Sequence, residues 1–107
     1  MNVVWLKRAI DDRRRNLLYI AERDATAALG QLAYIEGRAE DLADHPESGR
    51  VGRRRGTREC VVTHTPFIMI YRVRKRLGVV EIIRLLHGAQ QRPPMATDNR
   101  TPFIFEG

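Results

Sequence analysis

Cysteine is nearly absent from this chain of 107 residues, in which Cys60 is the single example. One thiol cannot form an intrachain disulfide, a CxxC redox pair or a thiolate zinc cluster, so we expect a protein of the reducing cytoplasm. Long hydrophobic runs are absent too. The run that starts at Val3 meets charge at Lys7, and no run approaches the roughly 18 residues that a membrane span needs. We therefore expect a soluble protein with no membrane partner.

Motifs for cofactor chemistry are also missing. The sequence contains no Walker motif, no GxGxxG fingerprint, no metal-spaced His/Asp set and no Ser/His/Asp order, so we expect neither a cofactor nor a metal ion. A chain of this length with 43% hydrophobic residues can form one domain but not two. We predict a single domain over residues 1–94 and a C-terminal tail over residues 95–107. The cluster Phe103–Phe105 of this tail either docks on the sheet or belongs to a disordered end.

Charge is abundant and unevenly distributed, with a net value of +6. Residues 1–49 hold seven Lys/Arg against nine Asp/Glu, a balance of −2, whereas residues 50–107 hold twelve against four, a balance of +8. Arginine, which dominates the basic residues, has a planar guanidinium that suits phosphate and carboxylate recognition better than a lysine ammonium does. The second half therefore predicts a polyanionic partner or an acidic protein that imitates one, with biased codon usage as the alternative origin of the arginines.

Hydrophobic spacing predicts one strand, two helices and then three more strands. Residues 2–6 are rich in β-branched and aromatic side chains, residues 7–23 follow helical spacing, and residues 25–44 form the clearest helix, with Asp24 as its N-cap. Short connections, which only antiparallel neighbours can use, join the β-rich runs at 57–65, 67–73 and 79–86. The predicted fold class is α+β: an N-terminal strand, an antiparallel helical hairpin and a three-stranded antiparallel meander, with the helices packed on one sheet face.

An arginine-rich segment between the helices and the last strands is the strongest candidate binding site. Residues 49–58 carry five arginines and three glycines, which expose charge and leave the backbone free, as in a loop or an edge strand. Such a segment can neutralise several phosphates. We also expect positive charge to gather where it meets Arg74–Arg76 and Arg92. The candidate binding residues are Arg50, Arg53, Arg54, Arg55 and Arg58.

Histidines and charges within strands are the remaining candidates. His87, at the end of the last predicted strand, is the best candidate for proton transfer, while His45 and His64 are weaker. The alternative role of His87 is a hydrogen bond to the start of the tail. His87 alone does not make the protein a ribonuclease, because no second general acid or base stands at a recognisable spacing from it. For Arg84 and Glu81 we predict Glu–Arg pairing across the sheet, because an unpaired buried ion is costly.

Four segments, in this order, resemble the RelE/ParE superfamily of toxins from type II toxin–antitoxin systems. They are LADHPESGR at 42–50, GTRE at 56–59, TPFIMIYRV at 65–73 and VEIIRLLHGAQQ at 80–91. The resemblance covers residues 2–94 and implies a compact, microbial-RNase-like α+β fold. It also implies a cytoplasmic bacterial protein of the plasmid-stabilisation type that inhibits growth. Its partner would be a cognate antitoxin, ParD-like, in a hetero-oligomer. Residues 50–58 of this chain could bind the acidic end of that antitoxin.

The superfamily has two kinds of target, and the sequence resembles ParE more than RelE. RelE-like proteins cut messenger RNA in the ribosomal A site, and they usually carry an arginine directly after the aromatic residue of the penultimate strand. Ile68 stands there in this chain, and isoleucine cannot stabilise a phosphate in transfer. The ribonuclease branch also tends to place an aromatic residue near the C-terminus, and none follows His87 in that strand. These departures favour a non-enzymatic toxin that binds DNA gyrase.

Two alternatives stay open. One is a ribosome-dependent mRNA endoribonuclease, in which His87 and an arginine from residues 50–58 replace the missing group. The other is a degenerate member of the superfamily that binds its antitoxin and has little toxicity.

Overall fold

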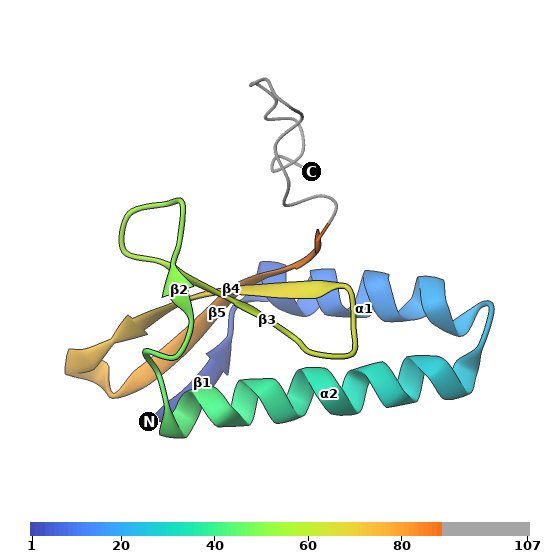
Figure 1. The fold of residues 1–107 in the computed structure, drawn as a ribbon, viewed down its shortest axis with the longest axis horizontal. Coiled ribbons are helices and arrows are strands. Elements are labelled where there is room, and N and C mark those ends of the chain that lie inside the picture. The colour runs from blue at the N-terminus through green and yellow to red at the C-terminus, as the bar shows by residue number, and fades with distance from the viewer. Residues whose placement is uncertain (89–107) are drawn as a thin grey trace, which may run out of the picture.

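The computed structural model describes residues 1–88. The tail predicted for residues 95–107 lies outside the described residues, as do Arg92 and the boundary at residue 94. The elements follow one another along the chain (Figure 1) as β1 (Asn2–Trp5), α1 (Lys7–Ala21), α2 (Ala25–Asp44), β2 (Arg50–Val51), β3 (Arg58–Val61), β4 (Phe67–Arg74), a 3₁₀ turn (Lys75–Leu77) and β5 (Val79–His87).

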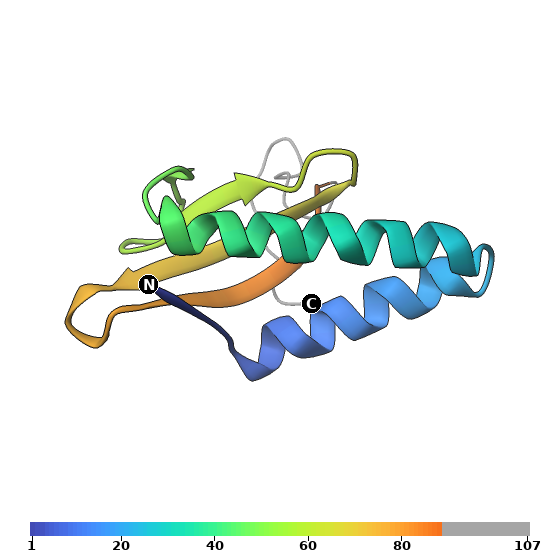
Figure 2. The same cartoon turned by 90° about the horizontal axis from the view of Figure 1, so that it is seen from below.

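The strands form one five-stranded sheet in the order β1-β5-β4-β3-β2. β1 is parallel to β5, and every other pair is antiparallel. Both helices lie on the same side of this sheet (Figure 2), and the predicted α+β class is confirmed. The short strand β2 is one addition, and it falls in the segment predicted to be a loop or an edge strand.

Local signals explain where the two helices begin and end. Asp24 caps α2, because its Oδ1 accepts a hydrogen bond from the Ala27 N–H at 3.0 Å, as predicted. α1 ends two residues before the predicted position, in a tight turn where the Asp24 N–H donates to the Ile20 carbonyl at 2.8 Å. α2 ends at Asp44, because Pro46 disfavours a helical conformation at the residue before it. The two helices consequently run antiparallel with almost no loop between them.

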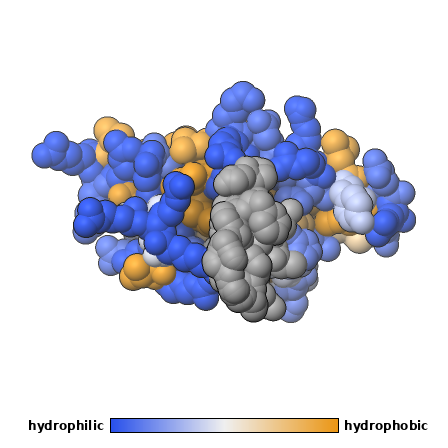
Figure 3. Space-filling view, turned by 90° about the horizontal axis from the view of Figure 1, so that it is seen from above, coloured by the Kyte–Doolittle hydropathy of each residue, from blue (hydrophilic) through white to orange (hydrophobic). Residues whose placement is uncertain are grey.

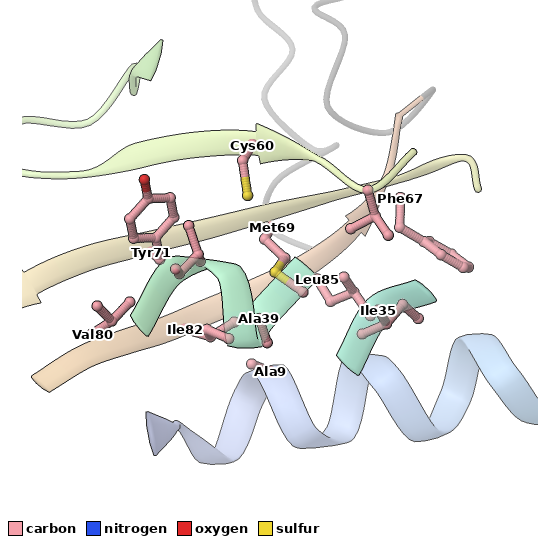
Figure 4. Close-up of a cluster of buried hydrophobic side chains, with 12 residues drawn as sticks. Ala9, Ile35, Ala39, Cys60, Phe67, Met69, Tyr71, Val80, Ile82 and Leu85 are labelled. Carbon is pink, nitrogen blue, oxygen red and sulfur yellow. The ribbon is translucent and has the colours of Figure 1, made fainter. Parts of the chain in front are cut away.

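The core lies between the helical hairpin and the sheet (Figure 4), where β4 and β5 face α2 and α1. Side chains alternate along β4, so Phe67, Met69 and Tyr71 are buried on the helix side and Ile68 and Ile70 face the other way, half-buried. Cys60 is also a buried core residue, and burial raises the pKa of its thiol. The remaining members of the core cluster are Ala9, Ile35, Ala39, Leu42, Val62, Val80, Ile82 and Leu85.

Polar side chains of α1 complete the sheet edge where β1 stops. β1 pairs with β5 only as far as Ile82, and the next backbone groups of β5 lie beside the helix. The Leu85 N–H donates to Asp12 Oδ2 at 3.0 Å, and the Leu85 carbonyl accepts from Asn16 Nδ2 at 3.3 Å. α1 thereby satisfies two backbone groups that an adjacent strand would otherwise bond.

Asp12 is also the centre of a buried ion network. Its carboxylate, with 3% of the side chain exposed, accepts hydrogen bonds from Arg84 at 2.7 and 3.1 Å and from Arg15 at 2.8 Å. The predicted Glu–Arg pairing across the sheet is confirmed for Glu81, which pairs with Arg72, and is wrong for Arg84, whose partner is Asp12 of α1. Arg72 lies directly opposite Glu81 in the β4–β5 register, whereas Arg84 lies three positions further along β5, beside α1.

Candidate functional site

The arginine loop, defined as residues 50–58, joins β2 to β3 as a tight hairpin that projects from the sheet (Figure 1). The Gly52 N–H donates to the Thr57 carbonyl at 2.8 Å, and both the N–H and the Oγ1 of Thr57 donate to the Arg54 carbonyl, at 3.1 and 2.7 Å. Gly56 turns the chain with φ of +79°, a conformation that glycine adopts without steric cost. The loop is thus held in one shape by its own backbone bonds.

A buried carboxylate fixes the base of the loop. Glu59, only 4% exposed, accepts from Arg50 Nη2 at 2.8 Å through Oε1 and from the Arg53 backbone N–H at 3.2 Å through Oε2. Charge-assisted hydrogen bonds of this kind are stronger than neutral ones. Glu59 therefore organises the arginine loop and neutralises part of the charge of Arg50.

The five candidate arginines have different environments. The Arg58 side chain is half-buried and its Nη1 donates to the Gly49 carbonyl at 2.8 Å and to the Glu47 carbonyl at 3.4 Å, so it braces the chain after α2. Arg50 is bound by Glu59, and Arg53 is exposed beside it. Arg54 and Arg55 are exposed, and their side chains make no ion pair or hydrogen bond with the described part of the chain. The tip of the loop, rather than its base, therefore leaves guanidinium groups exposed to solvent.

A buried tyrosine fixes the segment that leads from α2 into the loop. The Tyr71 hydroxyl donates to the Pro46 carbonyl at 2.8 Å and accepts from the Gly49 N–H at 2.9 Å. Burial raises the pKa of Tyr71, so the hydroxyl remains protonated and able to donate. These two hydrogen bonds of Tyr71 were not predicted from the sequence. The available signal was Gly49, directly before the arginines, because glycine allows the backbone to approach another segment of the chain closely.

The basic turn between β4 and β5 lies near the same end of the molecule as the arginine loop (Figure 1). Lys75 contacts the Glu47 carboxylate at 3.7 Å, and Arg58 bonds the carbonyl of the same residue. Arg72 and Arg74 approach Glu81 at 2.6 and 3.4 Å, and the Arg72 hydrogen bond lowers the pKa of that carboxyl. The face from which the loop projects carries mostly hydrophilic side chains with smaller hydrophobic patches between them (Figure 3).

The three histidines come from separate segments. His87 ends β5, where its exposed ring meets Phe67 edge-on with 6.1 Å between centroids. His64 lies in the β3–β4 turn with φ of 68° and packs against Tyr34 of α2, with 4.9 Å between ring centroids. His45 ends α2, where its N–H donates to the Asp41 carbonyl. In residues 1–88 no group of three His, Cys, Asp or Glu side chains is placed to bind a metal ion.

Ile68 lies on the sheet face opposite the helices, in an apolar setting. In register it sits between Val61 of β3 and Leu86 of β5. Val61 is 55% exposed, so this apolar strip reaches solvent at the β3 side. The position at which the ribonuclease branch carries an arginine is thus flanked by aliphatic side chains on both neighbouring strands.

The sheet, the helical hairpin packed on one of its faces and the exposed arginine hairpin define a small toxin of the RelE/ParE superfamily. Residues 3–92 match the family described as the ParE toxin of the type II toxin–antitoxin system parDE, and the chain belongs to this family. It is therefore the toxin component of a type II toxin–antitoxin system.

Relatives of known sequence agree with this assignment. Y4kP, a candidate toxin of Sinorhizobium fredii, is 37% identical over 89 residues, which cover 83% of this chain and 90% of that protein. Toxin RelE2 of Caulobacter vibrioides is 34% identical over 88 residues, which cover 82% of this chain and 96% of the relative.

A solved structure from the chromosomal ParDE toxin–antitoxin system of P. aeruginosa has the same fold. It superposes with a TM-score of 0.72 at 20% identity, covering 81% of this chain and 95% of that one. None of the helices in residues 1–88 combines the length and the apolar character of a membrane span.

Proposed function

We propose that this protein is a cytoplasmic toxin that inhibits DNA gyrase by binding it and that a cognate antitoxin, ParD-like, neutralises it. The observation that carries the proposal is the setting of Ile68. A ribonuclease needs a cation or a hydrogen-bond donor where negative charge develops on the phosphate, and Val61, Ile68 and Leu86 supply neither there. Arg38 and Arg50 line a groove beside Ile68, but they already donate hydrogen bonds to Ser48 and Glu59. Membership of the ParE family supports the same reading.

The arginine loop is the surface that we propose for both partners. Glu59 and the hairpin bonds hold the loop in shape before binding, so little conformational entropy remains to be lost on association. The exposed guanidinium groups of Arg54 and Arg55 fit carboxylates of an acidic protein segment. An antitoxin that covers this loop would neutralise the toxin by occluding its target-binding surface.

Reversing the charge at the tip of the loop is expected to weaken antitoxin binding. Like charges placed opposite one another cost several kcal/mol, so replacing Arg53, Arg54 and Arg55 by glutamate should raise the Kd about 100-fold or more at low salt. The same change of net charge on α1 and in the turn that follows it, with Lys7, Arg14 and Arg23 replaced by glutamate, is the matched control. Isothermal titration calorimetry at two salt concentrations measures both. Equal affinities and equal salt dependence for the two variants would remove the loop from the interface.

Gyrase supercoiling measured in vitro tests the proposed target. We expect wild type to inhibit supercoiling, the Arg53/Arg54/Arg55→Glu variant to need at least about ten times more protein, and His87→Ala to inhibit like wild type. Loss of a general acid or base typically costs about 10²–10⁴-fold in rate. If the inhibition depended on catalysis by His87, the His87→Ala variant would lose activity on that scale. Arg58 is left unchanged because it holds the Gly49 carbonyl. Supercoiling that is untouched by excess wild-type protein contradicts the gyrase assignment.

The ribonuclease alternative is the second candidate, because one relative carries the name RelE2. It places His87 and an arginine of the loop in the catalytic roles. Codon-specific cleavage of ribosome-bound message that disappears in His87→Ala would establish it in place of the gyrase proposal. A protein that binds its antitoxin but affects neither gyrase nor translation would be the degenerate member.

A further inference from the structure

Two basic turns leave the sheet at the same end. The arginine loop joins β2 to β3, and the basic turn, defined as Arg74–Arg76, leads from β4 toward β5. β3 is antiparallel to β4, with Arg58 opposite Tyr71, so the residues before β3 and the residues after β4 lie at one end of the sheet (Figure 1). Neighbouring strands lie about 4.8 Å apart, so turns that are two strand spacings apart are separated by about 10 Å.

The positive charge at this end exceeds what the nearby carboxylates neutralise. Residues 47–59 and 72–81 hold nine Arg/Lys and three Glu. Each of these glutamates already contacts a cation, in the pairs Glu47–Lys75, Glu59–Arg50 and Glu81–Arg72. Arg54, Arg55 and Arg76 are exposed, and their side chains make no ion pair or hydrogen bond within residues 1–88. A partner that supplies several anions side by side would balance this charge.

The residue types at this end fit the phosphates of a double-stranded nucleic acid. The guanidinium of arginine binds a phosphate through two parallel hydrogen bonds. Proteins that bind single strands add aromatic side chains on which the bases stack, and residues 47–59 and 72–81 contain no aromatic residue. The same segments contain no Asn or Gln, the amides that recognise adenine. Contacts with phosphates therefore dominate, and such contacts carry no sequence information.

The shape of the β2–β3 hairpin favours DNA over RNA. The hairpin is a two-stranded ribbon that projects from the sheet with Arg54 and Arg55 at its tip (Figure 1). The major groove of B-form DNA, about 12 Å wide, admits a two-stranded β-ribbon, whereas the major groove of an A-form RNA duplex is too narrow for side chains to read. With the tip of the hairpin in the groove, the basic turn about 10 Å away lies beside the flanking phosphate backbone.

We propose that this end of the sheet binds double-stranded DNA, with the arginine loop in the major groove and the basic turn on the flanking phosphates. The binding is independent of base sequence and weakens steeply with salt, because it rests on phosphate contacts. An antitoxin that covers the arginine loop would also displace the DNA. The inference shares this loop with the proposed function, but it concerns the toxin alone and requires no gyrase.

Fluorescence anisotropy of a short, labelled DNA duplex of mixed sequence, titrated with the full chain in the absence of gyrase and antitoxin, tests the proposal. About four neutralised phosphates predict a loss of affinity of about 100-fold between about 50 and about 200 mM salt. The double variant Arg54→Ala/Arg55→Ala removes two of these contacts. We expect it to bind at least about ten times more weakly at the lower salt concentration and to lose only about tenfold over the same range.

The matched control is Arg14→Ala/Arg23→Ala, which removes the same charge from α1 and the turn that follows it. Arg14 and Arg23 are exposed, as Arg54 and Arg55 are, so circular dichroism should show that both double variants keep the fold. The control variant should bind DNA nearly as wild type does and retain its salt dependence. A second duplex of different sequence should bind with the same affinity as the first.

Several results would overturn the inference. Absence of binding by wild type, or equal affinities of the two double variants, would remove this end of the sheet from any DNA contact. An RNA duplex bound as tightly as DNA would contradict insertion into the major groove, and a single strand bound more tightly would contradict recognition of a duplex. Gyrase inhibition without DNA binding by the toxin would remove this inference alone, whereas DNA binding without gyrase inhibition would remove the gyrase proposal alone.

Discussion

Replacing Asp12 with alanine is expected to lower the free energy of unfolding by about 3–5 kcal/mol, because it leaves a buried cation without its partner. Arg84, with 11% of its side chain exposed, would lose the carboxylate at 2.7 Å. The buried Leu85 N–H would lose its acceptor at the same time. Urea unfolding of wild type and variant, monitored by circular dichroism, measures the difference.

The neighbouring carboxylate supplies the control for this prediction. Asp11 lies next to Asp12 on the same helix, but its side chain is 46% exposed and its contact with Lys7 is a surface ion pair. Such pairs contribute about 0–1 kcal/mol, so Asp11→Ala should change stability little. If the two alanine variants unfolded at the same urea concentration, the network around Asp12 would not contribute to stability as the geometry indicates.

The helices could be predicted from the sequence because their signals are local. Asp24 caps the helix that starts next to it, and Pro46 prevents the helix from continuing two residues beyond its end. The partners of Asp12 could not be predicted in this way, because Arg84 and Leu85 lie more than 70 positions away. Nothing in the pattern of α1 distinguishes the buried Asp12 from the exposed Asp11.

The exposure of the arginine loop could be predicted from the sequence, but the different environments of its five arginines could not. The density of arginines between residues 50 and 58 indicates an exposed basic segment, and the structure places that segment in a projecting hairpin. Composition gives five equal arginines. Only the fold shows that Arg58 braces the backbone, that Glu59 holds Arg50, and that Arg54 and Arg55 at the tip stay exposed.

The glycine that enters the arginine loop is the second position where a small change should have a large effect. A Cβ at Gly49 would lie 2.7 Å from the Tyr71 hydroxyl and 2.8 Å from the Glu59 carbonyl oxygen. The carbonyl belongs to the sheet backbone and the tyrosine is buried, so neither can move away easily. The added methyl group must therefore displace the segment that contains Pro46 and Gly49.

Gly49→Ala is expected to lower the free energy of unfolding by about 3 kcal/mol. Overpacking costs about 1–3 kcal/mol, and a buried donor or acceptor left without its partner costs about 1–3 kcal/mol more, here at the bond between the Gly49 N–H and the Tyr71 hydroxyl. Gly37→Ala is the matched control: a Cβ there meets nothing within 4 Å, and alanine in a helix interior gains up to about 1 kcal/mol over glycine. The two substitutions add the same methyl group, so urea unfolding should shift in opposite directions. A Gly49→Ala variant as stable as wild type would mean that the segment yields without cost, and Tyr71 would then not fix the entry to the arginine loop.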